Sequence, residues 1–209
     1  MEGFRWVLDR SKVLSEEEVN KLLEMARKRA EIAKRKGNKV AVRDYFVIDL
    51  ALSTGLRVME IANLNCGDIY LNPGLSFLVV RRGKCGKKRI VWFNGRLKQH
   101  IEEYLSWKRE AGEETGDDAP LILSSNTKKH MTTRALQKAF KRCLKKAGLP
   151  EHFSFHSLRH TYGTHLYRAS NHNLRLVQEQ LGHSSIKTTE VYAGLMREDI
   201  SEALERLYR

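Results

Sequence analysis

The chain has 209 residues, of which 38 are Lys or Arg and 25 are Asp or Glu, so its formal net charge is +13. Hydrophobic residues make up 41% and charged residues 30%, which suits a folded core and excludes a disordered tail. No apolar run approaches the roughly 18 residues of a membrane span, and MEGFRWVLDR has no secretory h-region. The three cysteines are odd in number and far apart, which favours a reducing cytosol over a disulfide framework.

The positive charge is concentrated in two windows. Residues 77–100 contain eight basic residues and no acidic ones, and residues 124–175 contain eleven basic residues and one acid, Glu151. Long basic segments with almost no acidic residues indicate a polyanionic partner, in the first place nucleic acid. The alternative is a solvated helix face. It applies best to five basic residues on one predicted helix: Lys138, Lys141, Arg142, Lys145 and Lys146.

The first half of the chain predicts helices followed by a small sheet. The capping box from Ser15 to Glu18 begins a helix that runs to about Lys36, and Gly55 ends the next one. Further helices are expected at about Val42–Ser53 and Val58–Leu64. Strands are expected at Ile69–Leu71, Ser76–Arg81 and Arg89–Phe93, with a turn around Gly83–Gly86.

The second half predicts further helices. The ranges are Gly95–Ala111, Thr132 or Thr133 to Ala147, Ser157–Arg168, Leu174–Leu181, Ile186–Ala193 and a C-terminal helix with an apolar stripe at Ile200, Ala203, Leu204 and Leu207. An acidic loop, EETGDD, follows the first of them. There is no linker and no internal repeat. The expectation is therefore an α+β, mostly helical single domain over residues 1–209 with a small antiparallel β-sheet.

Several polar side chains stand at unusual places. Arg57 lies between two helices, and His156, Arg159 and His160 share one helix face through offsets of three and four. Lys84 falls at the hairpin tip, His183 at a helix end, and Tyr192 nine residues beyond it. Each has an ordinary alternative: an arginine that caps carbonyls, a hydrogen-bonded core histidine, a packed tyrosine.

A zinc site at His156 and His160 is disfavoured. A zinc protease helix carries HExxH, whereas the residues between these two histidines are Ser157, Leu158 and Arg159. The positive charge of Arg159 would repel a cation, and the sequence supplies no nearby cysteine pair or carboxylate.

Three segments together resemble the tyrosine recombinases, the phage-integrase family. They are DLALSTGLRVMEIANLNCGDI around Arg57, FHSLRHTYGTHL around His156, and LGHSSIKTTEVY, which ends at Tyr192. The resemblance runs from about Leu14 to Tyr192. It implies a tyrosine-recombinase-like catalytic domain and a catalytic set of Arg57, Lys84, His156, Arg159, His183 and Tyr192. Lys87 and Lys88 are alternatives to Lys84 as the hairpin lysine. Glu60 and His160 would hold the catalytic residues in place without contacting the substrate.

The chemistry of these residue types fits that resemblance. The phenolate of Tyr192 could store the energy of a broken phosphodiester in a covalent bond. Arg57 and Arg159 could grip the non-bridging oxygens through forked donors, and His183 would add another donor. Lys84 could protonate the leaving 5′ oxygen and His156 could accept the tyrosine proton. No step needs a cofactor or a metal.

The resemblance also implies double-stranded DNA as partner and a dimer or tetramer on it. Family members commonly pass a C-terminal segment to the next subunit, so residues 198–209 are expected to dock on a neighbour, with folding back on their own core as the alternative. Only 56 residues precede Arg57, so no separate N-terminal DNA-gripping domain is expected within this sequence, and it is either a naturally minimal recombinase or a fragment. Type IB topoisomerases share the chemistry, but the segment GHSSIKTTEVY resembles the recombinases. One other class stays open, a DNA-binding regulator that has lost catalysis.

Overall fold

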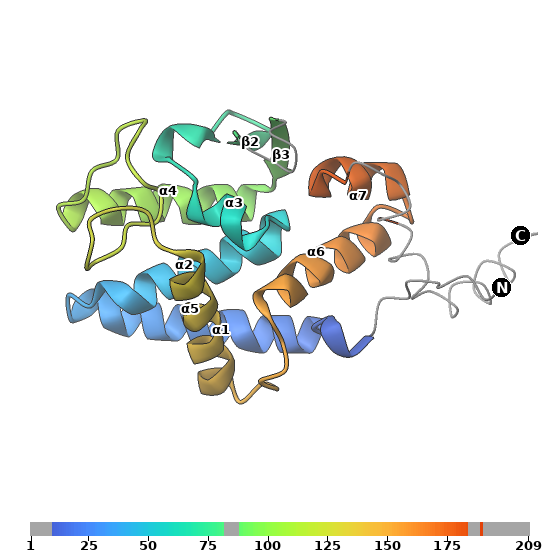
Figure 1. Ribbon diagram of the computed structural model, residues 1–209, viewed down its shortest axis with the longest axis horizontal. Helices are drawn as coiled ribbons and strands as arrows, with labels where there is room; N and C mark the ends of the chain where they lie inside the picture. Colours follow the sequence, from blue (N-terminus) through green and yellow to red (C-terminus); the bar gives the residue numbers. More distant parts are fainter. Residues whose placement is uncertain (1–9, 82–87, 184–188, 190–209) are drawn as a thin grey trace, which may run out of the picture.

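The computed structural model describes residues 10–81, 88–183 and 189, and its architecture is mostly helical with one antiparallel sheet (Figure 1). In chain order the elements are η1 (Arg10–Lys12), α1 (Glu16–Arg35), α2 (Lys39–Thr54), α3 (Val58–Ala62), η2 (Cys66–Asp68), β1 (Ile69–Tyr70), β2 (Ser76–Val80), β3 (Arg89–Phe93), α4 (Gly95–Glu110), α5 (Thr133–Ala147), α6 (Phe155–Ala169) and α7 (Leu174–Leu181). The α+β prediction is confirmed. The helices expected at Ile186–Ala193 and at the C-terminus lie outside the described residues.

The helix ends follow from local capping chemistry. The Ser15 hydroxyl accepts from the Glu18 backbone and the Glu18 carboxylate accepts from Ser15, which confirms the predicted capping box. Helix α2 begins at Lys39, earlier than expected, because the Asn38 side chain caps its first turn. It ends where Gly55 adopts φ 61°, a left-handed conformation that glycine allows without strain.

The sheet has the strand order β1-β2-β3, and both pairings are antiparallel. Leu78 pairs with Val91 across β2 and β3, and both side chains are fully buried on the inner face. On the outer face Phe77 stacks on Tyr70 and meets the edge of Trp92. The inner face thus joins the core, because successive side chains of a strand point to opposite faces of the sheet.

Helix α2 forms the centre of the core. It lies against α1 and also contacts α4, α5 and α6 (Figure 1). Phe46 is fully buried and stacks on Tyr104 of α4 with ring centroids 3.7 Å apart. No helix within the described residues is long and apolar enough to cross a membrane.

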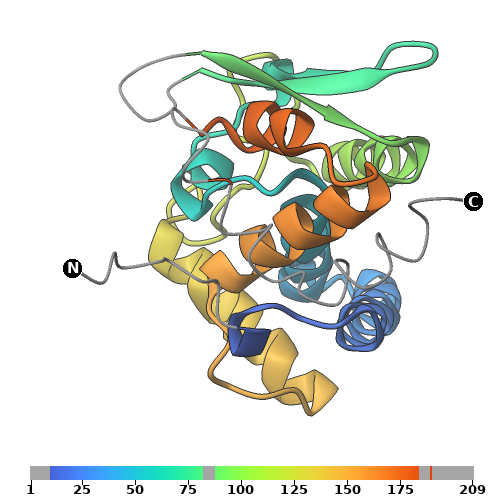
Figure 2. The ribbon, with the colours of Figure 1, turned by 90° about the vertical axis from the view of Figure 1, so that its right-hand side faces the viewer.

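Helix α7 lies between the sheet and α6 (Figure 2), and it contacts both β3 and α6. Val177 and Leu181, both fully buried, form a small apolar cluster with Tyr167 of α6. Burial of this stripe fixes the C-terminal end of α7, where His183 follows. The fold thereby brings α3, β3, α6 and the end of α7 to one region.

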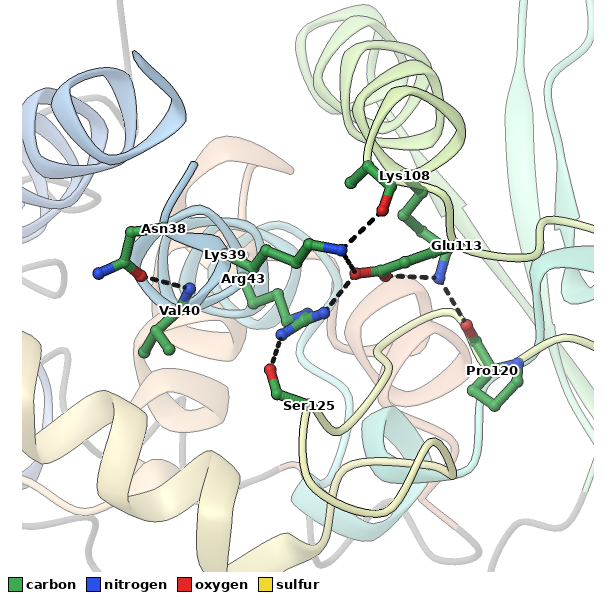
Figure 3. A network of polar contacts seen from close by, with 9 residues as sticks. Asn38, Lys39, Val40, Arg43, Lys108, Glu113, Pro120 and Ser125 are labelled. Atoms are coloured by element: carbon green, nitrogen blue, oxygen red, sulfur yellow. Dashed lines mark hydrogen bonds and ion pairs between the residues drawn. The ribbon is translucent and has the colours of Figure 1, made fainter. Parts of the chain in front are cut away.

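An ionic network fastens the loop after α4 to the core (Figure 3). Glu113, from the predicted acidic loop, has a 2% exposed side chain and pairs with Arg43 of α2 and Lys108 of α4. The Lys108 side chain is fully buried, and its Nζ also donates to the Pro120 carbonyl at 3.1 Å. Lys39, which is partly exposed, approaches the same carboxylate at 3.4 Å. Buried charges are tolerated here because each has a partner.

Candidate active site

Arg57 is held by a carboxylate within its own short helix. It is the N-cap residue of α3, and its backbone N–H donates to Glu60 Oε2 at 2.8 Å. Its Nη1 donates to Glu60 Oε1 at 2.9 Å. The Arg57 side chain is 31% exposed and that of Glu60 is 5% exposed. A buried carboxylate therefore orients a guanidinium that still reaches the surface.

The same carboxylate binds a second arginine that the sequence reasoning did not single out. Arg89, the first residue of β3, donates from Nη1 and Nη2 to the two oxygens of Glu60, both at 2.8 Å. Burial acts to raise the pKa of the Glu60 carboxyl. The hydrogen bonds and charge of Arg89, together with those of Arg57, outweigh it and lower that pKa to about 2. Glu60 is therefore ionised at neutral pH.

Arg159 is the arginine that contacts carbonyl groups. It lies on α6 and is 2% exposed, with Nη1 donating to the Gly55 carbonyl at 2.6 Å and Nη2 to the Leu181 carbonyl at 2.7 Å. These carbonyls stand at the C-terminal ends of α2 and α7, where backbone acceptors lack helical partners. An arginine that caps backbone carbonyls was the ordinary alternative to a functional role for Arg57. The structure shows that Arg159 makes such contacts, and it thereby joins α6 to the ends of α2 and α7.

Gly55 is required at that point by a close approach. A Cβ atom added there would lie 2.3 Å from Tyr162 Cδ1 and 2.8 Å from Leu181 Cδ2. The aromatic ring of α6 therefore rests directly on the backbone that follows α2. This packing brings the Arg57 segment, which begins two residues later, against α6 and α7.

The two histidines of α6 lie together, as their spacing predicts. The rings of His156 and His160 meet edge to face with centroids 4.3 Å apart. Burial, aided by the charges of Arg159 and Arg57, lowers the pKa of His156. Burial and the neighbouring His156 and Arg159 lower the pKa of His160 to about 4. Both imidazoles are therefore neutral at pH 7, and a neutral imidazole can accept a proton.

His183 lies in the turn that follows α7. Its backbone N–H donates to the Gln178 carbonyl, and its Nδ1 is 3.0 Å from the hydroxyl of Thr189. Burial lowers the pKa of His183 to about 3, with Arg159, Arg57 and Arg89 acting in the same direction. Contacts between these elements agree with that: Arg159 of α6 binds the Leu181 carbonyl at the end of α7, and Arg89 of β3 binds Glu60 of α3.

The fold thus brings Arg57, His156, Arg159 and His183 into one region, with the two predicted supporting residues, Glu60 and His160, beside them. Lys84 and Tyr192 lie outside the described residues, as does Lys87. The signal that could have revealed Arg89 is its place in a basic hairpin at the start of a half-buried strand. A local pattern cannot show which carboxylate it meets.

The basic helix α5 is partly engaged in structural contacts. Arg142 pairs with the buried Asp44 of α2, at 2.7 Å from Nη2, and Lys141 donates to the carbonyls of Glu151 and Phe153. Three exposed lysines of this helix have no ion pair with any residue that the structure describes: Lys138, Lys145 and Lys146. They remain available for a phosphate backbone.

The charged side chains near the paired histidines of α6 are positive. Within residues 10–81, 88–183 and 189 there is no cluster of three or more His, Cys, Asp or Glu side chains suited to a metal ion. The charged groups that act on the pKa of His156 are Arg159 and Arg57. This donor set suits an anion, because guanidinium groups bind phosphate and carboxylate oxygens.

Comparison with known proteins places this arrangement in a class. Residues 12–198 match the phage integrase family, and the chain belongs to it. Tyrosine recombinase XerD of Oceanobacillus iheyensis is 32% identical over 185 residues, which cover 88% of this chain and 58% of that protein. Tyrosine recombinase XerA of Pyrococcus furiosus is 34% identical over 198 residues, covering 93% and 61% of the two chains.

Solved structures agree with this assignment. The XerH site-specific recombinase bound to a palindromic difH substrate, in a post-cleavage complex, matches with a TM-score of 0.75 and 29% identity over 94% of this chain and 53% of that one. The XerA recombinase crystal structure matches with a TM-score of 0.73 and 27% identity, covering 94% of this chain and 63% of the other. The fold is that of tyrosine recombinase catalytic domains. The chain spans about six tenths of the length of each of these two curated relatives.

Proposed function

We propose that this chain carries the catalytic domain of a site-specific DNA recombinase that cuts and rejoins strands through a 3′-phosphotyrosine intermediate. The observation that carries the proposal is that Arg159 joins the segments that carry Arg57 and His183. Its guanidinium binds the carbonyls of Gly55 and Leu181, and its helix also carries His156. Such a set can bind a phosphodiester and move a proton beside it. Membership of the phage integrase family and likeness to the XerH complex with difH support DNA as the substrate.

In the proposed reaction, the hydroxyl of Tyr192 attacks the scissile phosphate. The phosphorus–oxygen bond to the 5′ oxygen breaks and a bond to the tyrosine oxygen forms. His156, whose lowered pKa favours the uncharged imidazole, accepts the phenolic proton. Lys84 protonates the leaving 5′ oxygen. Religation runs the same steps in reverse, so no external energy source is consumed.

Charge on the non-bridging oxygens is met by donors already in place. Arg57 reaches the surface from its carboxylate support. Arg159, whose Nη1 and Nη2 donate to the carbonyls of Gly55 and Leu181, adds its positive charge from the core side. His183, kept neutral, can still donate one N–H. Donors held in position before the reaction stabilise the transition state without reorganisation. In this proposal a dimer or tetramer forms on the DNA, which the palindromic substrate of the XerH complex favours, and the protein acts in the cytoplasm at the nucleoid.

The test is covalent capture on a nicked suicide duplex. The full chain is incubated with the labelled duplex and resolved on a denaturing gel. The natural chain should form a protein–DNA band, Tyr192→Phe should form none while its DNA affinity stays within about threefold, and Tyr167→Phe should behave as the natural chain. An adduct in Tyr192→Phe would reassign the nucleophile. Specific binding with no adduct from the natural chain would favour the alternative of a DNA-binding regulator.

A further inference from the structure

Arg89 touches two parts of the candidate site at once. Its guanidinium holds both oxygens of Glu60 at 2.8 Å in a parallel pair of hydrogen bonds, and its side chain is 13% exposed. A bidentate pair fixes direction as well as distance, which a single contact does not. Through Glu60, which also binds the backbone and Nη1 of Arg57, the position of β3 is transmitted to Arg57.

The stem of the same side chain supports the turn before His183. Gly182 ends α7 with φ 64°, and a Cβ atom added there would lie 2.5 Å from Arg89 Cδ and 2.6 Å from Arg89 Nε. The methylene groups of Arg89 thus occupy the space beside this glycine. The backbone that leads into His183 therefore packs against the side chain of Arg89, whose guanidinium binds Glu60.

We propose that Arg89 is a positioning residue that sets Arg57 relative to His183, an inference that rests on the proposed recombinase function. One side chain holds the carboxylate that orients Arg57 and supports the turn that carries His183. In this role Arg89 acts through Glu60 and through the backbone at Gly182.

The charge arrangement explains why an arginine is needed here. Glu60 is shared: Arg89 binds both of its oxygens, whereas the side chain of Arg57 binds only Oε1. Among the residues that the structure describes, Glu60 forms ion pairs with Arg57 and Arg89, so without Arg89 only Arg57 would pair with it. Its guanidinium would then turn to pair both oxygens and offer fewer donors to a phosphate. A lysine at position 89 would keep the charge but lose the second hydrogen bond.

The experiment is a double-mutant cycle in the full chain with Arg89→Lys, Glu60→Gln and the combination. The readouts are the single-turnover rate of adduct formation on the suicide duplex, the Kd for the same duplex and the melting temperature, with the rate expressed per folded molecule. We expect each single variant to slow cleavage by about 10- to 100-fold, because small misplacements of catalytic groups are costly, while Kd changes less than about threefold. The double variant should be no more than about threefold slower than the slower single variant, since both changes break one linkage.

The outcomes separate this inference from the proposed function. The inference would be overturned if the rate reductions of the two single variants multiplied in the double variant. It would also be overturned if Arg89→Lys cleaved at the natural rate, or if its slower cleavage came with an equal loss of DNA affinity. In all three cases the recombinase function stands, because the natural chain still cleaves. A natural chain that forms no adduct would overturn both.

Discussion

The guanidinium of Arg159 donates a 2.6 Å hydrogen bond to the carbonyl oxygen of Gly55, which lies 104 residues earlier in the chain. The second arm of the guanidinium reaches the carbonyl of Leu181 at 2.7 Å. One buried side chain therefore ties the end of α2 to the end of α7, and the geometry of the site depends on this junction.

Replacing Gly55 should disrupt the junction. Gly55→Ala places a Cβ 2.3 Å from the Tyr162 ring at a positive φ, so we expect the free energy of unfolding to fall by about 3 kcal/mol. The matched control is Gly37→Ala, because Gly37 has φ 67° but no atom within 4 Å of the added Cβ. It should lose only about 1 kcal/mol. Urea unfolding measures both, and equal losses would show that the close approach to Tyr162 carries no cost.

Glu113 should be among the most sensitive polar positions. Glu113→Gln removes the carboxylate that pairs with the buried Arg43 and Lys108, and leaving buried cations without a counter-charge costs about 3–5 kcal/mol. Glu114→Gln, one residue later and exposed, should change stability by less than about 0.5 kcal/mol. Thermal and denaturant unfolding test the contrast. A tolerated Glu113→Gln would mean that water reaches the network.

Acid should weaken the fold partly through its histidines. Folding lowers the pKa of His160 to about 4 and that of His183 to about 3, so between pH 6.5 and 4 the unfolded chain binds protons that the folded chain does not. Stability is then fully present above pH 6.5 and falls as the pH drops, by about 1 to 2 kcal/mol per group at pH 4.5 after solvent screening. Urea unfolding at pH 7.5 and 4.5 measures this. His160→Asn should flatten the dependence, whereas the exposed His152→Asn should not. If the free energy of unfolding fell equally with pH in the natural chain and in both variants, the lowered pKa of His160 would not contribute to acid sensitivity.

DNA binding should depend steeply on salt. Each phosphate neutralised by a lysine or arginine releases about 0.9 counterion, so we expect log Kd to rise with log salt at a slope of at least about 5. Converting the three exposed lysines of α5 (Lys138, Lys145 and Lys146) to Gln should lower that slope by up to about 3. The same change at Lys21 and Lys28 of α1 and at Lys36, which follows its last residue, serves as the control. Fluorescence anisotropy from 50 to 200 mM salt gives the slopes. If the α5 triple variant keeps the natural slope, these lysines form only a solvated face.

Short-range patterns determined most of the secondary structure. Ser15 and Glu18 interact within one helical turn, and Gly55 and Gly148 end helices through their own left-handed backbone, so neighbouring residues suffice to place these boundaries. The strands were expected as short apolar runs on either side of the turn around Gly83–Gly86, and β2 and β3 fall within the expected ranges. The prediction that His156 and His160 lie together needed only helical spacing.

Long-range pairing decided what the sequence by itself left open. Arg89 is one of eight basic residues in its window, and Glu113 is one of four acids in a loop. Only the packing of β3 on α3 and α7 turns Arg89 into the partner of Glu60, and only the approach of α2 and α4 buries Glu113 between Arg43 and Lys108. The physical reason is that a charge at the surface costs almost nothing wherever it lies, whereas a buried charge requires a partner. Which partner it meets is set by tertiary contacts between residues far apart in the chain.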